Sequence, residues 1–175
     1  MKKKFFNAKI YRNEAATEII VENGKISQIG TDLPKCDEEI DLNGKLVLPP
    51  YVDPHLHLDY VYTLSELGQE GAGSGTLFEA IELWPQFKKT LTVESVKRLA
   101  MKGIKDEVSQ GVQHIRTHID VTDPNFTALK AMLEMKQDLK DIVDIQIVAF
   151  PQEGMYMYKG GRDLVEEALK MGADA

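Results

Sequence analysis

Hydrophobic and polar positions alternate over short distances in the first fifty residues, as they do in β-strands. The apolar runs cover residues 5–11, 16–21 and 25–29. Asn23-Gly24 separates the last two runs and is typical of a tight hairpin turn, and Asn43-Gly44 repeats that signal. No helical periodicity is present in this stretch, so the pattern predicts a small β unit over residues 1–48, bounded by Pro49-Pro50.

Beyond the two prolines, apolar residues at helical spacing alternate with short apolar strands. Thr76 and Glu79 have the spacing of a capping box, and Thr92 is a second N-cap for a helix that should end before Gly111. Asp123-Pro124 predicts a third helix start, with proline at the first helical position. The predicted strands cover residues 114–121 and 143–150, and the last predicted helix covers residues 161–171 with Leu164, Val165, Ala168 and Leu169 as its buried stripe.

This alternation indicates parallel strands joined by helices. The predicted strands begin at residues 114 and 143, and the same spacing predicts that a fourth strand opens at residues 172–175. A parallel sheet normally has both faces covered, which three strands and their helices do not achieve. The predicted fold class is therefore α/β, with residues 49–175 forming the first three units of an incomplete, TIM-like (β/α)8 barrel.

Composition narrows the range of partners. The 43% hydrophobic and 28% charged residues are typical of a soluble globular chain, and a net charge of -7 disfavours nucleic acid and anionic membranes. Small molecules are the expected partners. Cys36 is the one cysteine, which fits a reducing, cytoplasmic setting, and Asn7 and Lys9 interrupt the apolar run that an export signal would need.

The first candidate for chemistry is the pair His55-Leu56-His57. Residues two apart on an extended strand project to the same side, so both imidazoles can converge on one ion. Imidazole suits zinc, iron and similar metals. Taken alone the spacing is a weak signal, and two ordinary surface or core histidines are the alternative. Asp53 and Asp59 flank the pair, either as groups that orient an imidazole or as turn residues.

The strand predicted over residues 114–121 has one polar and one apolar side. The polar side carries His114, Arg116, His118 and Asp120, and the apolar side carries Ile115, Thr117, Ile119 and Val121. In a barrel the apolar side faces the helices, so His118 and Asp120 should lie inside, near the functional carboxyl end. A structural role, in which the buried polar groups satisfy one another, is equally consistent with the pattern. His114 is not predicted to be a metal ligand.

Four stretches of the sequence together resemble bacterial cytosine deaminases of the amidohydrolase superfamily. They are residues 50–59 (PYVDPHLHLD), 74–84 (SGTLFEAIELW), 116–121 (RTHIDV) and 146–154 (QIVAFPQEG). The resemblance covers residues 45–175 in the same order and with similar spacing. It implies a metal-dependent barrel with a small β-sandwich portion built partly from residues 1–48.

The resemblance also implies roles for individual residues. His55 and His57 correspond to metal ligands for one divalent ion, Fe²⁺ or Zn²⁺. Asp59, His118 and Asp120 are possible supporting groups because of their positions in the sequence, and the resemblance does not assign them. Gln152 corresponds to a glutamine that hydrogen-bonds the pyrimidine, and Leu77 to a residue that contacts its amino side through the backbone. The family's other metal ligands and its proton-transfer residues come from later strands. No residue of this chain matches them, so we expect the 175 residues alone to be inactive.

The activity implied is hydrolytic deamination of cytosine to uracil and ammonia, in a complete protein that is expected to be a homo-oligomer. Creatinine, isoguanine or another cyclic amidine is an alternative substrate, since the same pocket chemistry could accept these rings. A different class of function also stays open. If the 175 residues are the entire product, an inactive remnant or a binding module is the better interpretation.

Overall fold

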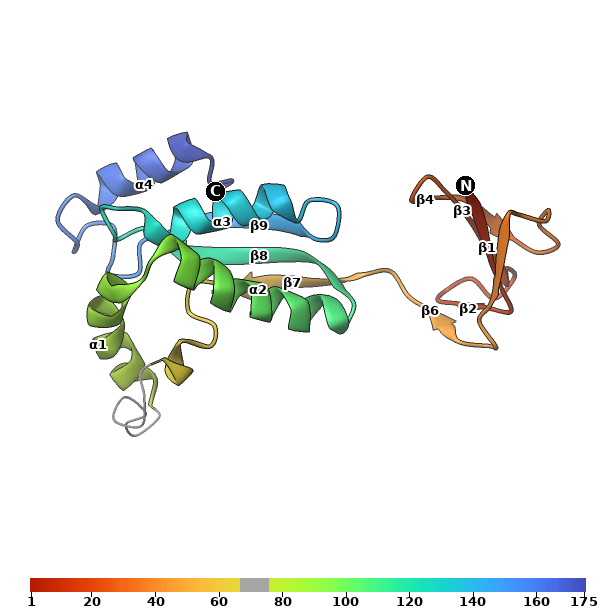
Figure 1. Cartoon of the computed structure of the whole chain (residues 1–175), viewed down its shortest axis with the longest axis horizontal. Coiled ribbons are helices and arrows are strands. Elements are labelled where there is room, and N and C mark those ends of the chain that lie inside the picture. The colour runs from red at the N-terminus through yellow and green to blue at the C-terminus, as the bar shows by residue number, and fades with distance from the viewer. Residues whose placement is uncertain (67–75) are drawn as a thin grey trace. The chain divides into compact units, whose positions relative to one another are not determined.

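A computed structural model of the chain describes residues 1–66 and 76–175 (Figure 1). Contacts within the chain separate two compact units, Met1–Pro49 and Pro50–Ala175, and each is described by itself below. Among the helices in the described ranges, none is long and apolar enough to cross a membrane.

The first unit is built from short strands. They are β1 (Lys2–Phe6), β2 (Lys9–Ile10), β3 (Glu18–Glu22), β4 (Lys25–Gly30), β5 (Glu38–Asp41) and β6 (Leu46–Val47). One sheet has the order β4-β3-β1-β5, and β2 pairs with β6. Asn23 and Gly24 both have positive φ, 52° and 76°, in the tight turn between β3 and β4, which confirms the predicted hairpin. The run predicted over residues 5–11 is divided into β1 and β2, because Asn7 adopts a left-handed conformation with φ 54°.

The second unit consists of one parallel sheet and its helices. The strands are β7 (Tyr51–Leu56), β8 (Val112–Asp120) and β9 (Asp144–Phe150), in the order β7-β8-β9. The helices are α1 (Leu77–Phe87), α2 (Val93–Ser109), α3 (Thr127–Asp138) and α4 (Gly161–Met171), with short 3₁₀ turns η1 (Thr63–Ser65) and η3 (Lys88–Thr90). This alternation of strand and helix confirms the α/β class.

One face of the sheet is buried beneath helices. Ile115, Thr117 and Ile119 of β8 are at most 2% exposed, as predicted for the apolar side of that strand. The same core takes in residues from three helices, among them Val96, Ala100 and Ile104 of α2, Leu129 and Met132 of α3, and Ala168 of α4. This packing fixes the three strands side by side, so that their carboxyl ends share one edge of the sheet.

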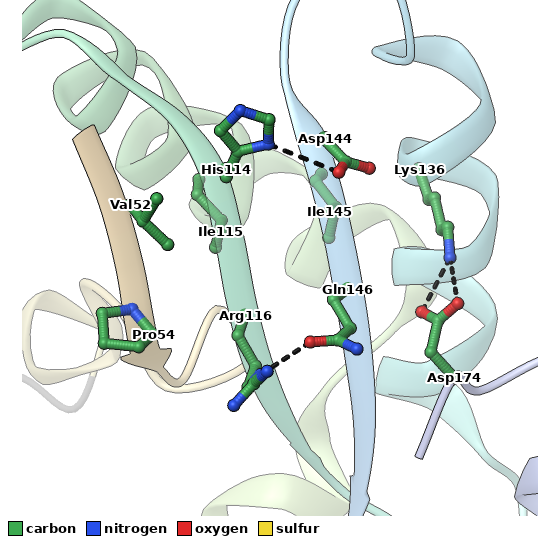
Figure 2. Close-up of a pocket in the computed structure, with 10 residues that line it drawn as sticks. All are labelled: Val52, Pro54, His114, Ile115, Arg116, Lys136, Asp144, Ile145, Gln146 and Asp174. Atoms are coloured by element: carbon green, nitrogen blue, oxygen red, sulfur yellow. Dashed lines mark hydrogen bonds and ion pairs between the residues drawn. The ribbon is translucent and has the colours of Figure 1, made fainter. Parts of the chain in front are cut away.

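The opposite face of the sheet is open and polar. Figure 2 shows a pocket of about 350 Å³ on this face, lined by side chains from all three strands. Arg116 Nε donates to Gln146 Oε1 at 2.6 Å, and His114 lies 3.4 Å from Asp144. These polar side chains pair across β8 and β9 near the amino halves of the strands, and His114 is thereby placed away from the carboxyl edge.

Residue Ala175 adds to the edge of the sheet at β9. Its amide donates to the carbonyl of Ile147 at 3.3 Å, and its carbonyl accepts from the amide of Ala149 at 2.7 Å. These two bonds have the pattern of a parallel pair. Residues 172–175 do not form the predicted fourth strand, although these two bonds place Ala175 against β9.

Two further local predictions are wrong. Helix α3 begins at Thr127 and not at Pro124, because the Asp123 carboxylate accepts from the amides of Asn125 and Thr127, both at 2.9 Å, and so forms a turn ahead of the helix. Leu169, predicted in the buried stripe of α4, is 43% exposed. The helix contacts the core through Leu164, Val165 and Ala168, which leaves Leu169 on its outer side.

Replacing Leu129 with alanine should destabilise this unit strongly. The side chain is fully buried in the shared core of sheet and helices, so its loss removes apolar contacts and leaves a cavity. We expect the free energy of unfolding to fall by about 2–5 kcal/mol in urea titrations of the purified protein. Ile142→Ala is the matched control, since Ile142 is 58% exposed and should change stability little. Equal effects from the two variants would contradict the described core.

Candidate functional site

Three histidines gather at the carboxyl edge of the sheet. His55 is the second-last residue of β7, and His57 directly follows that strand. Their ring centroids are 5.4 Å apart. His118, near the end of β8, stacks on His55 at 4.2 Å and lies 5.6 Å from His57. We call these three residues the histidine cluster. The parallel pairing of β7 with β8 brings them together.

Unpaired polar atoms are concentrated at the same place. Within the described part of the chain, the buried side-chain atoms that lack a hydrogen-bond partner are His57 Nδ1, His118 Nδ1, Asp59 Oδ1 and the Tyr60 hydroxyl. Each such atom costs roughly 1–3 kcal/mol if it stays unpaired, so their concentration indicates a place where further polar partners bind. The carboxyl edge is therefore the candidate functional site.

The surroundings of His57 and His118 favour the neutral form of both imidazoles. Burial lowers the pKa of His57, and the neighbouring His118 and His55 lower it further. Burial also lowers the pKa of His118, with His55 contributing in the same direction. A neutral imidazole has a free lone pair on one ring nitrogen, which is the form that binds a metal ion.

The cluster fits part of a metal site. Imidazole nitrogens are suitable donors for zinc or iron, and two of the cluster's ring nitrogens are buried without partners. Across residues 1–66 and 76–175, however, no set of three or more His, Cys, Asp or Glu side chains is arranged to hold an ion. The buried, unpaired ring nitrogens belong to His57 and His118, and the described residues alone do not complete a ligand set.

Asp59 is buried beside His57, and no hydrogen bond joins the two side chains. The residue is 2% exposed, its Oδ2 accepts from the main-chain amide of Asp120 at 2.8 Å, and its Oδ1 lies 4.0 Å from His57 Nδ1. Burial raises the pKa of Asp59 to about 8. Asp53, the other flanking carboxylate, instead accepts from the amide of His55 at 2.9 Å, which is a turn role.

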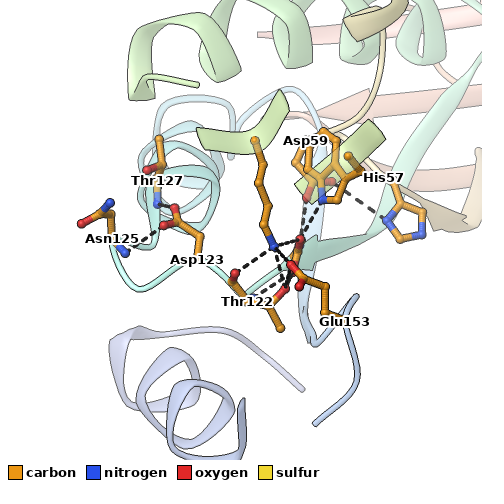
Figure 3. A network of polar contacts seen from close by, with 10 residues as sticks. His57, Asp59, Thr122, Asp123, Asn125, Thr127 and Glu153 are labelled. Carbon is orange, nitrogen blue, oxygen red and sulfur yellow. Dashed lines mark hydrogen bonds and ion pairs between the residues drawn. The ribbon is translucent and has the colours of Figure 1, made fainter. Parts of the chain in front are cut away.

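Asp120 turns its carboxylate away from the histidine cluster and toward helix α1. Its Oδ2 accepts from Trp84 Nε1 at 2.7 Å and from Lys88 Nζ at 3.1 Å, and its Oδ1 accepts from the amide and hydroxyl of Thr122 (Figure 3). Trp84, Lys88 and Glu153 were not singled out from the sequence. Trp84 and Lys88 are four residues apart, a spacing that places them on one side of a helix, and this is the one local signal that could have linked them.

Gln152 follows strand β9, and Leu77 begins helix α1. Gln152 follows Pro151 after the end of β9, and its amide donates to the carbonyl of Phe150 at 3.1 Å. The Phe150 ring lies 5.4 Å from His57 and 6.0 Å from His118, so β9 ends beside the histidine cluster. Leu77 is the first residue of α1, where main-chain amides have no acceptor within the helix. Ser74 and Gly75, which begin the second resembling stretch, lie outside the described residues.

Comparisons with known proteins agree on one family. The model of the amidohydrolase family matches residues 38–173. The crystal structure of 5-methylcytosine deaminase from Klebsiella pneumoniae liganded with 5-fluorocytosine is 43% identical, with a TM-score of 0.86, over 98% of this chain and 42% of that chain. The N-isopropylammelide isopropylaminohydrolase from Burkholderia multivorans is 26% identical, with a TM-score of 0.81, over 99% of this chain and 44% of that chain.

A curated relative gives the same result at the level of sequence. The N-isopropylammelide isopropyl amidohydrolase of Pseudomonas sp. (strain ADP) is 33% identical over 172 residues, which are 96% of this chain and 43% of that protein. The chain therefore spans less than half the length of each of these three relatives.

Proposed function

Since this chain belongs to the amidohydrolase family, we propose that it is the amino-terminal part of a metal-dependent enzyme that deaminates cytosine or a 5-substituted cytosine. The products are the corresponding uracil and ammonia. The single observation that carries this proposal is the meeting of His55, His57 and the Gln152 segment at one edge of the sheet. The 43% identity with a deaminase of 5-methylcytosine supports the choice of substrate class.

The sheet supports a barrel as the complete architecture. Its strands are parallel, one face is covered by helices, and the other exposes Val52, Arg116 and Gln146. Parallel sheets are normally covered on both faces, and closing the strands into a barrel covers the second face because the inward-facing side chains pack against one another. We infer that further β/α units complete a (β/α)8 barrel and that the first unit contributes to a β-sandwich portion.

His55 and His57 are proposed to hold one divalent ion, Fe²⁺ or Zn²⁺, together with ligands from outside the described residues. When bound, the ion supplies Lewis acidity that makes water nucleophilic near neutral pH. Asp59, whose Oδ1 lies 4.0 Å from His57 Nδ1, is proposed to orient that ring once the ion is bound, and the ring of His118 stacks on His55. The proposed role of Gln152 is to bind the planar base, since an amide offers one acceptor and two donors to the polar edge of cytosine.

A second candidate is hydrolysis of an N-alkylated ring such as N-isopropylammelide. The relative from Pseudomonas sp. (strain ADP), at 33% identity, favours it. The two candidates can be separated by comparing kcat/KM of the complete, metal-loaded protein for cytosine, 5-methylcytosine, N-isopropylammelide, creatinine and isoguanine. We expect the highest value for one of the cytosines. A higher value for N-isopropylammelide would replace deamination with the second candidate.

The 175 residues produced alone are expected to release no ammonia from cytosine, even with added iron or zinc. The reason is that the described residues hold no set of three or more side chains able to bind a metal. An ammonia assay on the purified chain checks this, with the complete protein as the positive control. Turnover that disappears in a His55→Ala variant would show that the chain itself contains the rest of the site.

A further inference from the structure

Lys88 occupies a nearly closed environment at the start of η3, where helix α1 ends. Its side chain is 9% exposed. The ammonium group donates to the carbonyl of Thr122 at 2.8 Å, to the Thr122 hydroxyl at 2.9 Å and to Asp120 Oδ2 at 3.1 Å, and it forms a short contact with Glu153 Oε1 (Figure 3). All three of its N–H donors can therefore be used within the protein.

These partners come from segments that are far apart in the sequence. Asp120 is the last residue of β8 and Thr122 lies two residues beyond it, whereas Glu153 is 65 residues from Lys88 in the turn after β9. Lys88 thus joins helix α1, the end of β8 and the turn after β9 at a single nitrogen. Within the described ranges, no second cation forms an ion pair with Asp120 or Glu153.

The charges at this junction make the position of the turn that carries Glu153 dependent on Lys88. Burial acts to lower the pKa of Lys88, but the hydrogen bond to Glu153 and the charge of Asp120 outweigh it, so the pKa is raised and the group stays charged. Without this cation, the Asp120 and Glu153 carboxylates would face each other across Thr122, whose hydroxyl lies 2.5 Å from one and 3.5 Å from the other. Like charges in a partly buried site repel strongly, so the turn that carries Glu153 would move away.

We propose that Lys88 is a positioning residue that anchors the turn after β9 to the end of β8 and thereby fixes Gln152, the neighbour of Glu153, for binding the base. This inference rests on the proposed function of Gln152. Lys88 touches neither substrate nor metal in this role. It acts on the turn through Glu153 and on the strand through Asp120.

The alternative is that Lys88 serves stability alone, and kinetics separate the two. Lys88→Met removes the charge and keeps the length of the side chain. In the complete, metal-loaded enzyme we expect it to raise KM for cytosine and lower kcat/KM by about 10–100-fold, the range found for residues that support a binding group. Metal content should stay at the wild-type value, because Asp59 is bound by the main-chain amide of Asp120 and not by its carboxylate.

Four further variants sharpen the result. Lys88→Arg keeps the charge and should retain more kcat/KM than Lys88→Met. Glu153→Gln removes the other half of the contact from a residue whose side chain is 31% exposed, so it should fold even if Lys88→Met does not. The double variant should lose less than the sum of the single losses, since both remove one interaction. Lys89→Met, at the adjacent exposed lysine, is the matched control and should behave as wild type.

Amide hydrogen exchange tests the anchor independently of any substrate. Two amides within residues 151–158 are hydrogen-bonded. The amide of Gly154 donates to the carbonyl of Pro151, and the amide of Tyr158 donates to the carbonyl of Gly154. Peptides covering residues 151–158 should exchange faster in Lys88→Met and in Glu153→Gln, while peptides from β8 stay protected. Unchanged exchange in both variants would overturn the proposal, as would faster exchange with an unchanged KM or a loss of metal that parallels the loss of activity.

The same pair of measurements separates this inference from the proposed function. If the complete wild-type protein fails to deaminate any cytosine, the proposed function is wrong. The exchange result then decides by itself whether Lys88 anchors the turn.

Discussion

Replacing His55 or His57 with alanine is expected to remove bound metal and deaminase activity together from the complete enzyme. Both rings lie at the carboxyl end of β7 with centroids 5.4 Å apart, and their removal deletes proposed ligands and not merely groups that support them. Activity should therefore fall by more than the roughly 100-fold typical of supporting residues. Metal analysis of the purified variants, alongside kcat/KM for cytosine, provides the measurement.

His114→Ala is the matched control for this experiment. His114 is exposed, lies on the open face of β8 and contacts Asp144, so its loss should leave metal content and activity near the wild-type values. Circular dichroism of each variant reports whether the sheet and helices remain. Full metal occupancy in His55→Ala or His57→Ala would end the ligand assignment for that residue, whatever happens to the activity.

Gln152→Ala should damage the use of cytosine far more than the binding of metal. Without the Gln152 side chain, the polar edge of the bound base loses its hydrogen-bond partner. Sites built to hydrogen-bond a polar group of the substrate reject analogues that lack this group by a factor of roughly 10⁴ or more in kcat/KM. We therefore expect kcat/KM for cytosine to fall by a factor approaching roughly 10⁴, while the metal content is unchanged. Steady-state kinetics and metal analysis on the same preparation give both quantities.

Gln113→Ala controls for the loss of an amide elsewhere on the molecule. Gln113 is exposed on β8 and should tolerate the change. If Gln152→Ala keeps its metal and retains nearly normal kcat/KM, Gln152 is only a turn residue. The proposal of cytosine over other ring substrates would then lose its main support from this chain.

Local periodicity was sufficient to predict most elements of the second unit. Helix α4 has the bounds predicted for it, and α1 and α2 begin after the predicted caps, Thr76 and Thr92. These features depend on residues only a few positions apart. The start of α3 was misplaced because Asp123 can cap a helix or form a turn, and the choice depends on the conformation of Phe126, which is left-handed with φ 53°.

The candidate site was predictable only in part, because most of its contacts join segments that are far apart in the sequence. His55 and His57 are two residues apart on one strand, so their proximity follows from strand geometry. The partners of Lys88 are 32 to 65 residues away, and no local pattern indicates which strand end will meet which turn. The stacking of His118 on His55 likewise depends on the register between β7 and β8, which includes an irregularity between Asp53 and Leu56.

Trp84 is the one tryptophan of the chain, and its surroundings make it an optical probe of the site. Its ring lies 3.8 Å from that of Tyr60 and 6.2 Å from that of Phe87, and its indole nitrogen donates to Asp120 at 2.7 Å. Indole emission responds to the polarity and charge around the ring. The indole emission of this chain, excited selectively over its six tyrosines, therefore originates at the carboxyl edge of the sheet, and ligand binding there can be followed without any attached dye.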